Sequence, residues 1–261
     1  MSALREDAAG DLELREIKTF GEIDACVALQ RQTWGMPDLE VTGSHLFVIA
    51  AYSGTPAIGA FAADGRLVGF LHMLFANFYG TPAYYSHMLA VDESWRDKGV
   101  GYRLKLAQRD RALENDVPLV VWTFDPLQSR NAHFNVNKLG AVIRRYVVNF
   151  YGENNFTVFD AGIGSDRVFA EWWVRSEKVE RALAGERFRP ATTAAGVEIP
   201  ADINRIKRTD HGSALLWRLH TRERFQSRLS RGLVAVALEH EPDSEHSTYV
   251  FADAREVHLD R

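Results

Sequence analysis

The sequence predicts a mixed α/β layer fold. Residues 12–17 alternate apolar and polar side chains with the period of a strand, whereas residues 20–34 carry apolar side chains at helical spacing. Two apolar runs, 57–63 and 67–75, flank Asp64-Gly65-Arg66, and Asp-Gly between apolar runs is a strong hairpin signal. Strand and helix patterns alternate after this point, which is typical of layered α/β proteins.

The later elements follow the same two periodicities. Nearly every position of residues 84–91 and 118–124 is apolar, as in strands covered on both faces. In chain order, we further expect a helix over 99–113, a short helix over 131–139 ended by Gly140, strands over 141–150 and 167–174, a short helix capped by Ser176, a loop over 186–196, a long helix capped by Asp210 or Ser213 and ended by Gly232, and strands over 233–238 and 248–252.

Composition excludes several classes of protein. The 261 residues are 46% hydrophobic and 25% charged, which is ordinary for a globular chain. A net charge of -4 argues against nucleic acid as the main partner. No run approaches the roughly 18 apolar residues of a membrane span, and the start of the chain carries no signal-peptide pattern. Cys26, the single cysteine, lies among apolar residues and is expected in the core. We therefore expect a cytoplasmic protein.

A glycine turn is the central motif. Arg96-Asp97-Lys98-Gly99-Val100-Gly101 joins a predicted central strand to a predicted helix. The first amides of a helix have no partner within it, so this end is electropositive and suits a phosphate group. A Walker loop is excluded because its Gly-x-x-x-x-Gly-Lys-Ser/Thr string is absent. The dinucleotide fingerprint is excluded because its third glycine would stand at Leu104.

The remaining pattern, Arg-x-x-Gly-x-Gly, resembles the signature of the GCN5-related N-acetyltransferase (GNAT) superfamily. Behind it come a strand, then Asn131, then Leu139-Gly140-Ala141, in the order this superfamily shows. The resemblance covers roughly residues 12–150. Less specifically, the whole chain is similar to a branch of about this length in which Ser86-His87-Met88 and Asp125-Pro126-Leu127 recur. The resemblance to the GNAT superfamily implies a central mixed, mostly antiparallel sheet flanked by helices, with a GNAT domain over residues 12–160 and a C-terminal α/β extension over 161–261.

The resemblance also implies an acyl-CoA co-substrate, and no spacing of His, Cys or carboxylates indicates a metal site. The pyrophosphate would lie on the glycine turn and the pantetheine arm beside the central strand. The residues implied to contact CoA are Leu89, Ala90, Val91, Arg96, Asp97, Lys98, Gly99, Val100, Gly101, Tyr102 and Asn131. For Asn131, a helix N-cap is an equally good explanation.

Three residues are candidates for catalysis: His87, Tyr85 and Asp125. The ordinary pKa of histidine suits deprotonation of an amine near neutral pH, although a core histidine is also expected on such a strand. Tyr85 is explained equally by packing, as are Tyr102, Tyr146 and Tyr151. Asp125 either binds an acceptor ammonium or caps the turn before Pro126. Many relatives carry a tyrosine that acts as general acid to the thiolate where this chain has Val136, so the identity of the general acid is left open.

These residues lead to one main expectation and two alternatives. We expect transfer of acetyl, or another acyl group such as succinyl, from acyl-CoA to the amine of a small molecule, for which an amino acid is the first candidate. The alternatives are a non-catalytic acyl-CoA-binding module and a protein N-acetyltransferase. No nucleic acid or membrane partner is expected, and a homodimer is left open. Five arginines of the long C-terminal helix form either a solvated face or an anion clamp: Arg218, Arg222, Arg224, Arg228 and Arg231.

Overall fold

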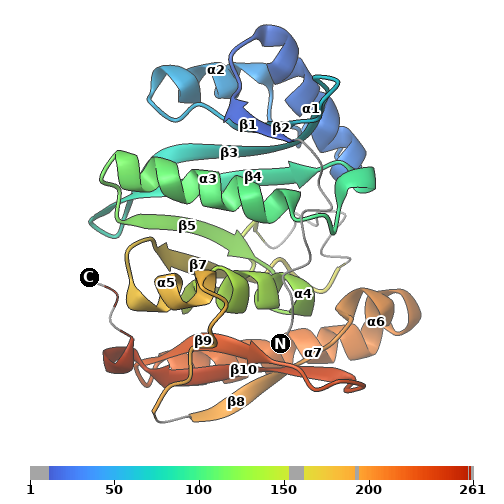
Figure 1. Cartoon of the computed structure of the whole chain (residues 1–261). Helices are drawn as coiled ribbons and strands as arrows, with labels where there is room; N and C mark the ends of the chain where they lie inside the picture. The colour runs from blue at the N-terminus through green and yellow to red at the C-terminus, as the bar shows by residue number, and fades with distance from the viewer. Residues whose placement is uncertain (1–11, 153–161, 192–193, 258, 260–261) are drawn as a thin grey trace. The chain divides into compact units, whose positions relative to one another are not determined.

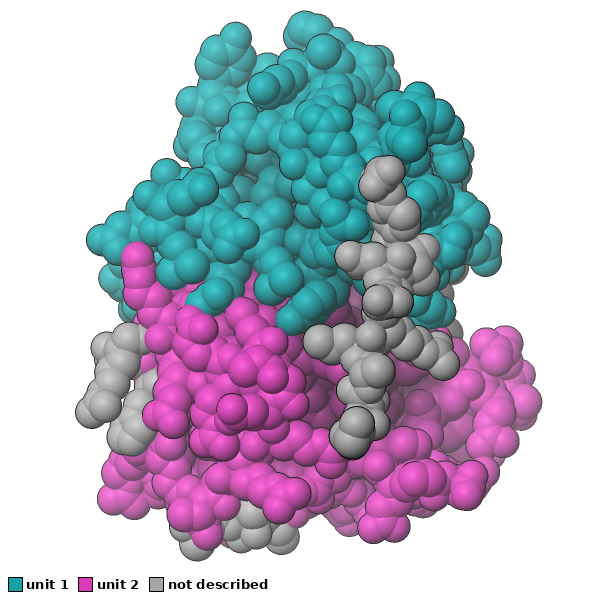
Figure 2. Space-filling model, viewed as in Figure 1, with its two compact units in different colours: residues 1–120 teal, residues 121–261 magenta. Residues whose placement is uncertain are grey.

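The computed structural model describes residues 12–152, 162–191, 194–257 and 259. The chain forms two compact units, residues 1–120 and 121–261, which Figure 2 colours separately. Both units place helices against antiparallel strands, and this confirms the predicted mixed α/β class with a mostly antiparallel sheet. The units follow packing within the chain and not family boundaries, so the division at residue 160 stays a prediction. No described helix is both long enough and apolar enough to cross a membrane.

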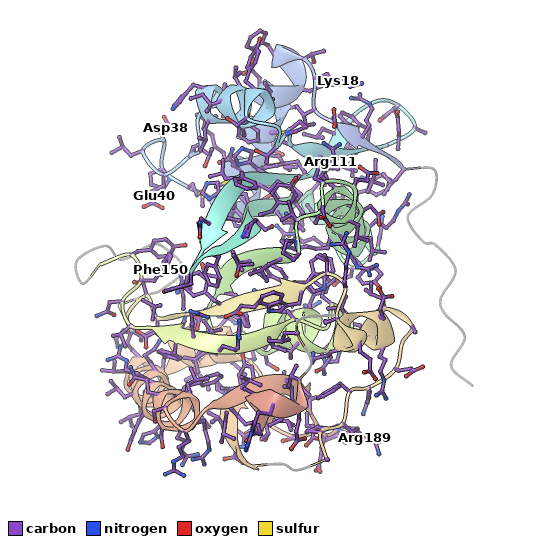
Figure 3. All side chains as sticks on the ribbon, turned by 90° about the vertical axis from the view of Figure 1, so that its left-hand side faces the viewer. Lys18, Asp38, Glu40, Arg111, Phe150 and Arg189 are labelled. Atoms are coloured by element: carbon purple, nitrogen blue, oxygen red, sulfur yellow. The ribbon has the colours of Figure 1, made fainter. Side chains whose placement is uncertain are left out.

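The described part of unit 1 contains four complete strands in sequence order, each antiparallel to the next (Figure 1). They are β1 (Glu13–Glu16), β2 (Ile58–Phe61), β3 (Leu67–Phe78) and β4 (Thr81–Val91). The helices are α1 (Phe20–Trp34), α2 (Ser44–Tyr52) and α3 (Val100–Glu114), and η1 (Glu93–Trp95) precedes α3. α2 was not predicted. Arg111 of α3, labelled in Figure 3, pairs with Glu16 of β1 and ties this helix to the edge of the sheet.

Helix α1 begins and ends at the predicted residues because both ends are capped. Thr19 Oγ1 accepts from the Glu22 amide at 3.2 Å, and the Glu22 carboxylate accepts from the Thr19 amide at 3.0 Å. This capping box satisfies two amides that the helix leaves without partners. Gly35 ends the helix in the left-handed region, with φ 60°. Cys26 is fully buried, as predicted, in the core that α1 and α2 form with Phe70 and Ala90.

A β-bulge at His87 is the main irregularity of the β3–β4 hairpin. The turn at Tyr79-Gly80 has positive φ at both residues, which suits a two-residue hairpin. From this turn the pairing is regular up to Met73 and Ser86, but His72 then faces Met88, so His87 is the extra residue. A one-residue shift moves every later side chain to the other face of the strand. Met88 and Ala90 therefore join the α1–α2 core, whereas Leu89 and Val91 lie toward α3.

Unit 2 contains the last residues of β5 and five further strands, in the order β5-β7-β6-β9-β10-β8. The strands are β5 (Leu119–Phe124), β6 (Val142–Val147), β7 (Arg167–Trp173), β8 (Ala194–Pro200), β9 (Leu233–Glu239) and β10 (His246–Asp253). The helices are α4 (Ser129–Ala132), the π-helical turn η2 (His133–Lys138), α5 (Glu177–Leu183), α6 (Ile203–Thr209), α7 (His211–Leu229) and the turn η3 (Ala254–Glu256).

Two predictions in unit 2 were incomplete. The expected loop over 186–196 ends in β8, which begins at Ala194 and pairs antiparallel with β10. Helix α6 was not expected, although the long helix behind it was, and Asp210 caps α7 by accepting from the Ser213 amide at 3.0 Å. Strand β8 was missed because its pairing with a strand some fifty residues away leaves no local pattern in the sequence. Phe225 of α7 packs edge-on against Tyr249 and Phe251, which anchors this helix in the unit.

Gly140 gives the Leu-Gly-Ala turn its structural role. Its φ is 78°, and a Cβ built on it would lie 2.9 Å from Val179 Cα and 3.0 Å from Lys178 O of α5. We expect Gly140→Ala to lower the free energy of unfolding by about 2–5 kcal/mol, since a left-handed residue gains strain and the helix must shift. Gly185→Ala is the matched control, because Gly185 has φ 80° with open space around it. Its cost should be about 1 kcal/mol. Equal losses in urea unfolding of the two variants would show that close packing at Gly140 is unimportant.

Candidate functional site

The glycine turn leaves the first turn of α3 open. Gly99 is the N-cap residue with φ 81° and gives the helix no side-chain cap, and the first helical bond runs from the Arg103 amide to Gly99 O at 3.0 Å. Nothing lies within 4 Å of a Cβ built on Gly99. Backbone amides at such a helix start attract anions, because the helix dipole is positive there. This geometry fits a phosphate group.

Strand β4 runs beneath this helix start. A Cβ built on Gly101 would lie 3.5 Å from Leu89 Cδ2 and 3.9 Å from Val91 Cγ2, which are ordinary contact distances. Ala90 points to the opposite face, where it is buried with Phe70. Of the three strand residues predicted to contact CoA, the bulge thus places Leu89 and Val91 on the side of the glycine turn. Ala90 could take part only through its backbone.

The charged residues of the turn are exposed. Arg96 lies 4.0 Å from Glu93, and the ammonium of Lys98 lies 5.1 Å from the centre of the Trp95 ring. Exposed pairs of this kind contribute little to stability. Both cations are therefore available near the helix start. Asp97 has φ 60° and, with Gly99, gives the turn its left-handed bend.

His87 lies on the α1–α2 face of the sheet, where three groups meet. Its Nε2 is 3.1 Å from Thr42 Oγ1, in the segment between α1 and α2. Its ring packs edge-on against His72 of β3, with the ring centres 5.7 Å apart. Desolvation by the surrounding protein lowers the pKa of His87 below its ordinary 6.5, although the residue as a whole is exposed. The imidazole is therefore neutral at pH 7 and can accept a proton.

His72 is fully buried beneath this site. Burial, and then the neighbouring His87, lower the pKa of His72 to about 4, while a backbone contact with Leu46 partly opposes this shift. His72 is therefore neutral at pH 7. Tyr85 lies on the same face of β4, because Tyr84 and Ser86 on either side of it contact α3. The predicted pair His87 and Tyr85 thus lies on one face of one strand.

Asp125, the third predicted catalytic residue, is a structural anchor of unit 2. Its Oδ1 accepts from the Leu127 amide at 2.9 Å, which confirms the cap of the turn before Pro126. Arg218 Nη1 donates to the same oxygen at 2.8 Å, and Lys207 Nζ lies 3.6 Å from Oδ2. Burial alone would raise the pKa of Asp125, but the two cations bring it below its ordinary value. Binding of an acceptor by Asp125 stays a prediction.

We expect Asp125→Asn to lower the free energy of unfolding by about 3–5 kcal/mol, because it leaves the fully buried Arg218 without its counter-charge. Thermal unfolding of the variant checks this expectation. Asp253→Asn removes the carboxylate of an exposed pair with Arg255 and should change stability little. Unchanged stability of Asp125→Asn, together with reduced turnover, would instead favour a role in acceptor binding.

Two arginines of the C-terminal helix bind carboxylates within unit 2, contrary to a simple solvated face. Arg218 is fully buried on Asp125, and Arg222 binds Asp166 through two hydrogen bonds of 2.8 and 2.9 Å. Tyr146 also donates to Asp166, at 2.6 Å, and burial followed by that carboxylate raises its pKa. Tyr146 is thus a poor candidate for the general acid. Arg224 and Arg231 are exposed, as a solvated face requires.

The N-cap interpretation of Asn131 was wrong. Helix α4 begins at Ser129, so Asn131 lies inside it, exposed, with Oδ1 accepting from Asn135 Nδ2 at 3.3 Å. The prediction that Asn131 contacts CoA is neither supported nor opposed by this placement. Val136 is buried in η2, and its carbonyl accepts from Lys178 Nζ at 3.0 Å. No hydroxyl stands at this position to protonate a thiolate.

A polar cluster under α3 was missed. Lys105 is buried and donates to Ser86 Oγ at 2.9 Å and to Gln108 Oε1 at 3.0 Å. Burial lowers its pKa well below 10.5. The sequence carried only a weak signal, namely a lysine on the apolar side of a helix between Leu104 and Leu106. The described residues include no cluster of three or more His, Cys, Asp or Glu side chains that could bind a metal ion.

Comparison with known proteins agrees with the geometry. Residues 23–140 match the model of the acetyltransferase (GNAT) family, as the resemblance predicted. The fold is similar to the ribosomal-protein-S18-alanine N-acetyltransferase of Escherichia coli, with TM-score 0.50 and 12% identity over 63% of this chain and 94% of that one. It is also similar to an N-acetyltransferase of Staphylococcus aureus Mu50, with TM-score 0.50 and 16% identity over 64% and 100% of the two chains. The curated proteins contain no match to this sequence.

Proposed function

We propose that this chain is an acyl-CoA-dependent N-acyltransferase that acts on the amine of a small molecule. One observation carries the proposal: the bulge in β4 presents neutral His87 on one face and places Leu89 and Val91 beneath the open start of α3 on the other. The proposed base therefore lies on one face of β4, and the proposed phosphate seat lies over its other face. The GNAT family match over residues 23–140 supports acyl-CoA as the donor.

The proposed reaction needs a base for the acceptor's ammonium and groups that stabilise the negative charge on the carbonyl oxygen. His87 removes a proton from the acceptor's ammonium, and the free amine then attacks the thioester carbon. The C–N bond forms as the C–S bond breaks, and the attacking nitrogen loses its second proton to water to give the neutral amide. The CoA thiolate takes a proton from water, since Val136 supplies none. Backbone amides of β4 are the groups that the resemblance implies for stabilising the carbonyl oxygen. The proton on His87 is returned to solvent.

We propose a small-molecule amine as the acceptor, without the preference for an amino acid that the sequence suggested. An amino-acid acceptor depended mainly on the arginines of the C-terminal helix. Arg218 and Arg222 are committed to Asp125 and Asp166, so that support is reduced. Acetyl is proposed as the acyl group, and succinyl stays an alternative. The buried Val136 favours one competing function, a module that binds acyl-CoA without turning it over.

Release of free thiol from a panel of acyl-CoA donors and amines tests the proposal. The donors should include acetyl-CoA and succinyl-CoA, and the acceptors should include polyamines, amino acids and a short peptide with a free N-terminus. Amine-dependent thiol release is expected with at least one small amine. Tight CoA binding without release on any acceptor would favour the binding module, whereas release with the peptide alone would favour a protein acetyltransferase.

A further inference from the structure

We propose that Gln30 and Thr42 are positioning residues for His87, holding its ring in the orientation and tautomer that a general base requires. The proposal deepens the function proposed above and rests on it, since it assigns His87 the proton from the acceptor. Neither Gln30 nor Thr42 belongs to a motif of the glycine turn. Gln30 lies in α1 and Thr42 in the segment between α1 and α2, so only the folded structure brings them into contact.

Gln30 fixes the backbone of Thr42. Its side chain is fully buried in α1. Its Nε2 donates to Thr42 O at 3.1 Å, and the Thr42 amide donates to Gln30 Oε1 at 2.8 Å. Two parallel hydrogen bonds restrict both translation and rotation of the residue they hold. An amide buried without these partners would be costly, so the pair is expected to stay formed.

Thr42 in turn contacts the imidazole. Its Oγ1 lies 3.1 Å from His87 Nε2. A neutral histidine carries one N–H and one lone pair, and a threonine hydroxyl can donate to the lone pair or accept from the N–H, so the 3.1 Å contact fits either direction. In the proposed direction, Nε2–H donates to Thr42 Oγ1, the lone pair lies on Nδ1, and Nδ1 accepts the proton from the acceptor. Thr42 also accepts from the imidazolium that results and stabilises it.

The other neighbours of His87 limit its ring without competing for the proton. His72 of β3 packs edge-on against it and is itself packed 4.4 Å, between ring centres, from Phe47 of α2. His72 is neutral at pH 7 and places no charge beside the ring. Tyr85 shares this face of β4. Among the described residues, His72 from β3 and the Thr42 hydroxyl from the α1–α2 segment thus contact the His87 ring, and Tyr85 lies on the same face of its own strand.

Nuclear magnetic resonance of the protein with 15N-labelled histidine tests the proposal directly, because the chemical shifts of the ring nitrogens report the tautomer and the pKa. In the wild type, we expect His87 to carry its hydrogen on Nε2. Thr42→Val keeps the volume but removes the hydroxyl, so the tautomer should become mixed and the pKa of His87 should fall. Thr42→Ser should restore both. Gln30→Met, which keeps volume and loses the amide, should change the signals in the same direction as Thr42→Val.

Thr33→Val is the matched control, since the hydroxyl of Thr33, which lies in α1 as Gln30 does, has no hydrogen-bond partner among the described residues. It should leave the His87 signals unchanged. In kinetic assays, Thr42→Val should lower kcat about tenfold without changing KM for acyl-CoA, a part of the roughly 100-fold or larger contribution of a general base. The proposal is overturned if His87 keeps the same tautomer and pKa in Thr42→Val. A separate result tests the proposed base: unchanged activity in a His87 variant would refute the catalytic role of His87. The effect of Thr42 and Gln30 on the tautomer and pKa of His87 could still be measured in that case.

Discussion

Gly101→Asp should reduce the affinity for CoA by about 100-fold or more, because it places a carboxylate at a helix start that would hold a pyrophosphate. The fold should tolerate the change. A Cβ at this position meets Leu89 and Val91 only at ordinary contact distances. Glycine is also a poor residue inside a helix, and an acidic side chain near a helix start is favourable. Stability against heat should therefore be kept or slightly increased. Calorimetric titration with CoA measures the affinity.

Gly101→Asn is the matched control for charge, since it has the shape of the aspartate variant. It should weaken binding much less. Gly101→Ala tests close approach of the backbone alone, because its methyl group adds no charge. An affinity of Gly101→Asp within about threefold of the wild type, a difference below 1 kcal/mol, would show that the phosphate seat lies elsewhere.

His87→Gln should lower kcat by about 100-fold or more at neutral pH while leaving CoA affinity unchanged. Glutamine can replace a hydrogen bond to Thr42 but cannot accept a proton. In the wild type, kcat/KM should rise with pH through a pKa below 6.5, because His87 must lose its proton before it can act as a base. This acidic limb should disappear in the variant. Steady-state assays from pH 5 to pH 9 would check both expectations.

His220→Gln controls for the loss of any histidine, because His220 is an exposed residue of α7. It should keep both the rate and the pH profile. An unchanged acidic limb in His87→Gln would assign the titration to another group and remove His87 from the mechanism. A loss of CoA affinity in the same variant would indicate a binding role instead.

The sequence by itself determined the local elements and, through the GNAT resemblance, indicated the kind of ligand. Helix α1 was predicted to the residue, because Thr19, Glu22 and Gly35 cap it through contacts with near neighbours in the chain. The glycine turn was equally local, since strand end, turn and helix start follow one another. Gly99 does occupy the left-handed region there. After the Walker and dinucleotide motifs were excluded, the resemblance to the GNAT superfamily, carried also by Asn131 and Leu139-Gly140, implied an acyl-CoA site, and the family match over residues 23–140 agrees.

Tertiary structure decided which residues share the site. Asp125 follows a strand and resembles a catalytic carboxylate in the sequence, yet Arg218, some ninety residues later, binds it. Gln30, Thr42 and His72 carry no local signal because their contacts join separate elements. The bulge at His87 is the sharpest case. The apolar run over residues 84–91 is the same with or without the bulge, but the extra residue reverses the faces of Leu89, Ala90 and Val91. A strand's sequence records its period, whereas its register is set by the partner strand.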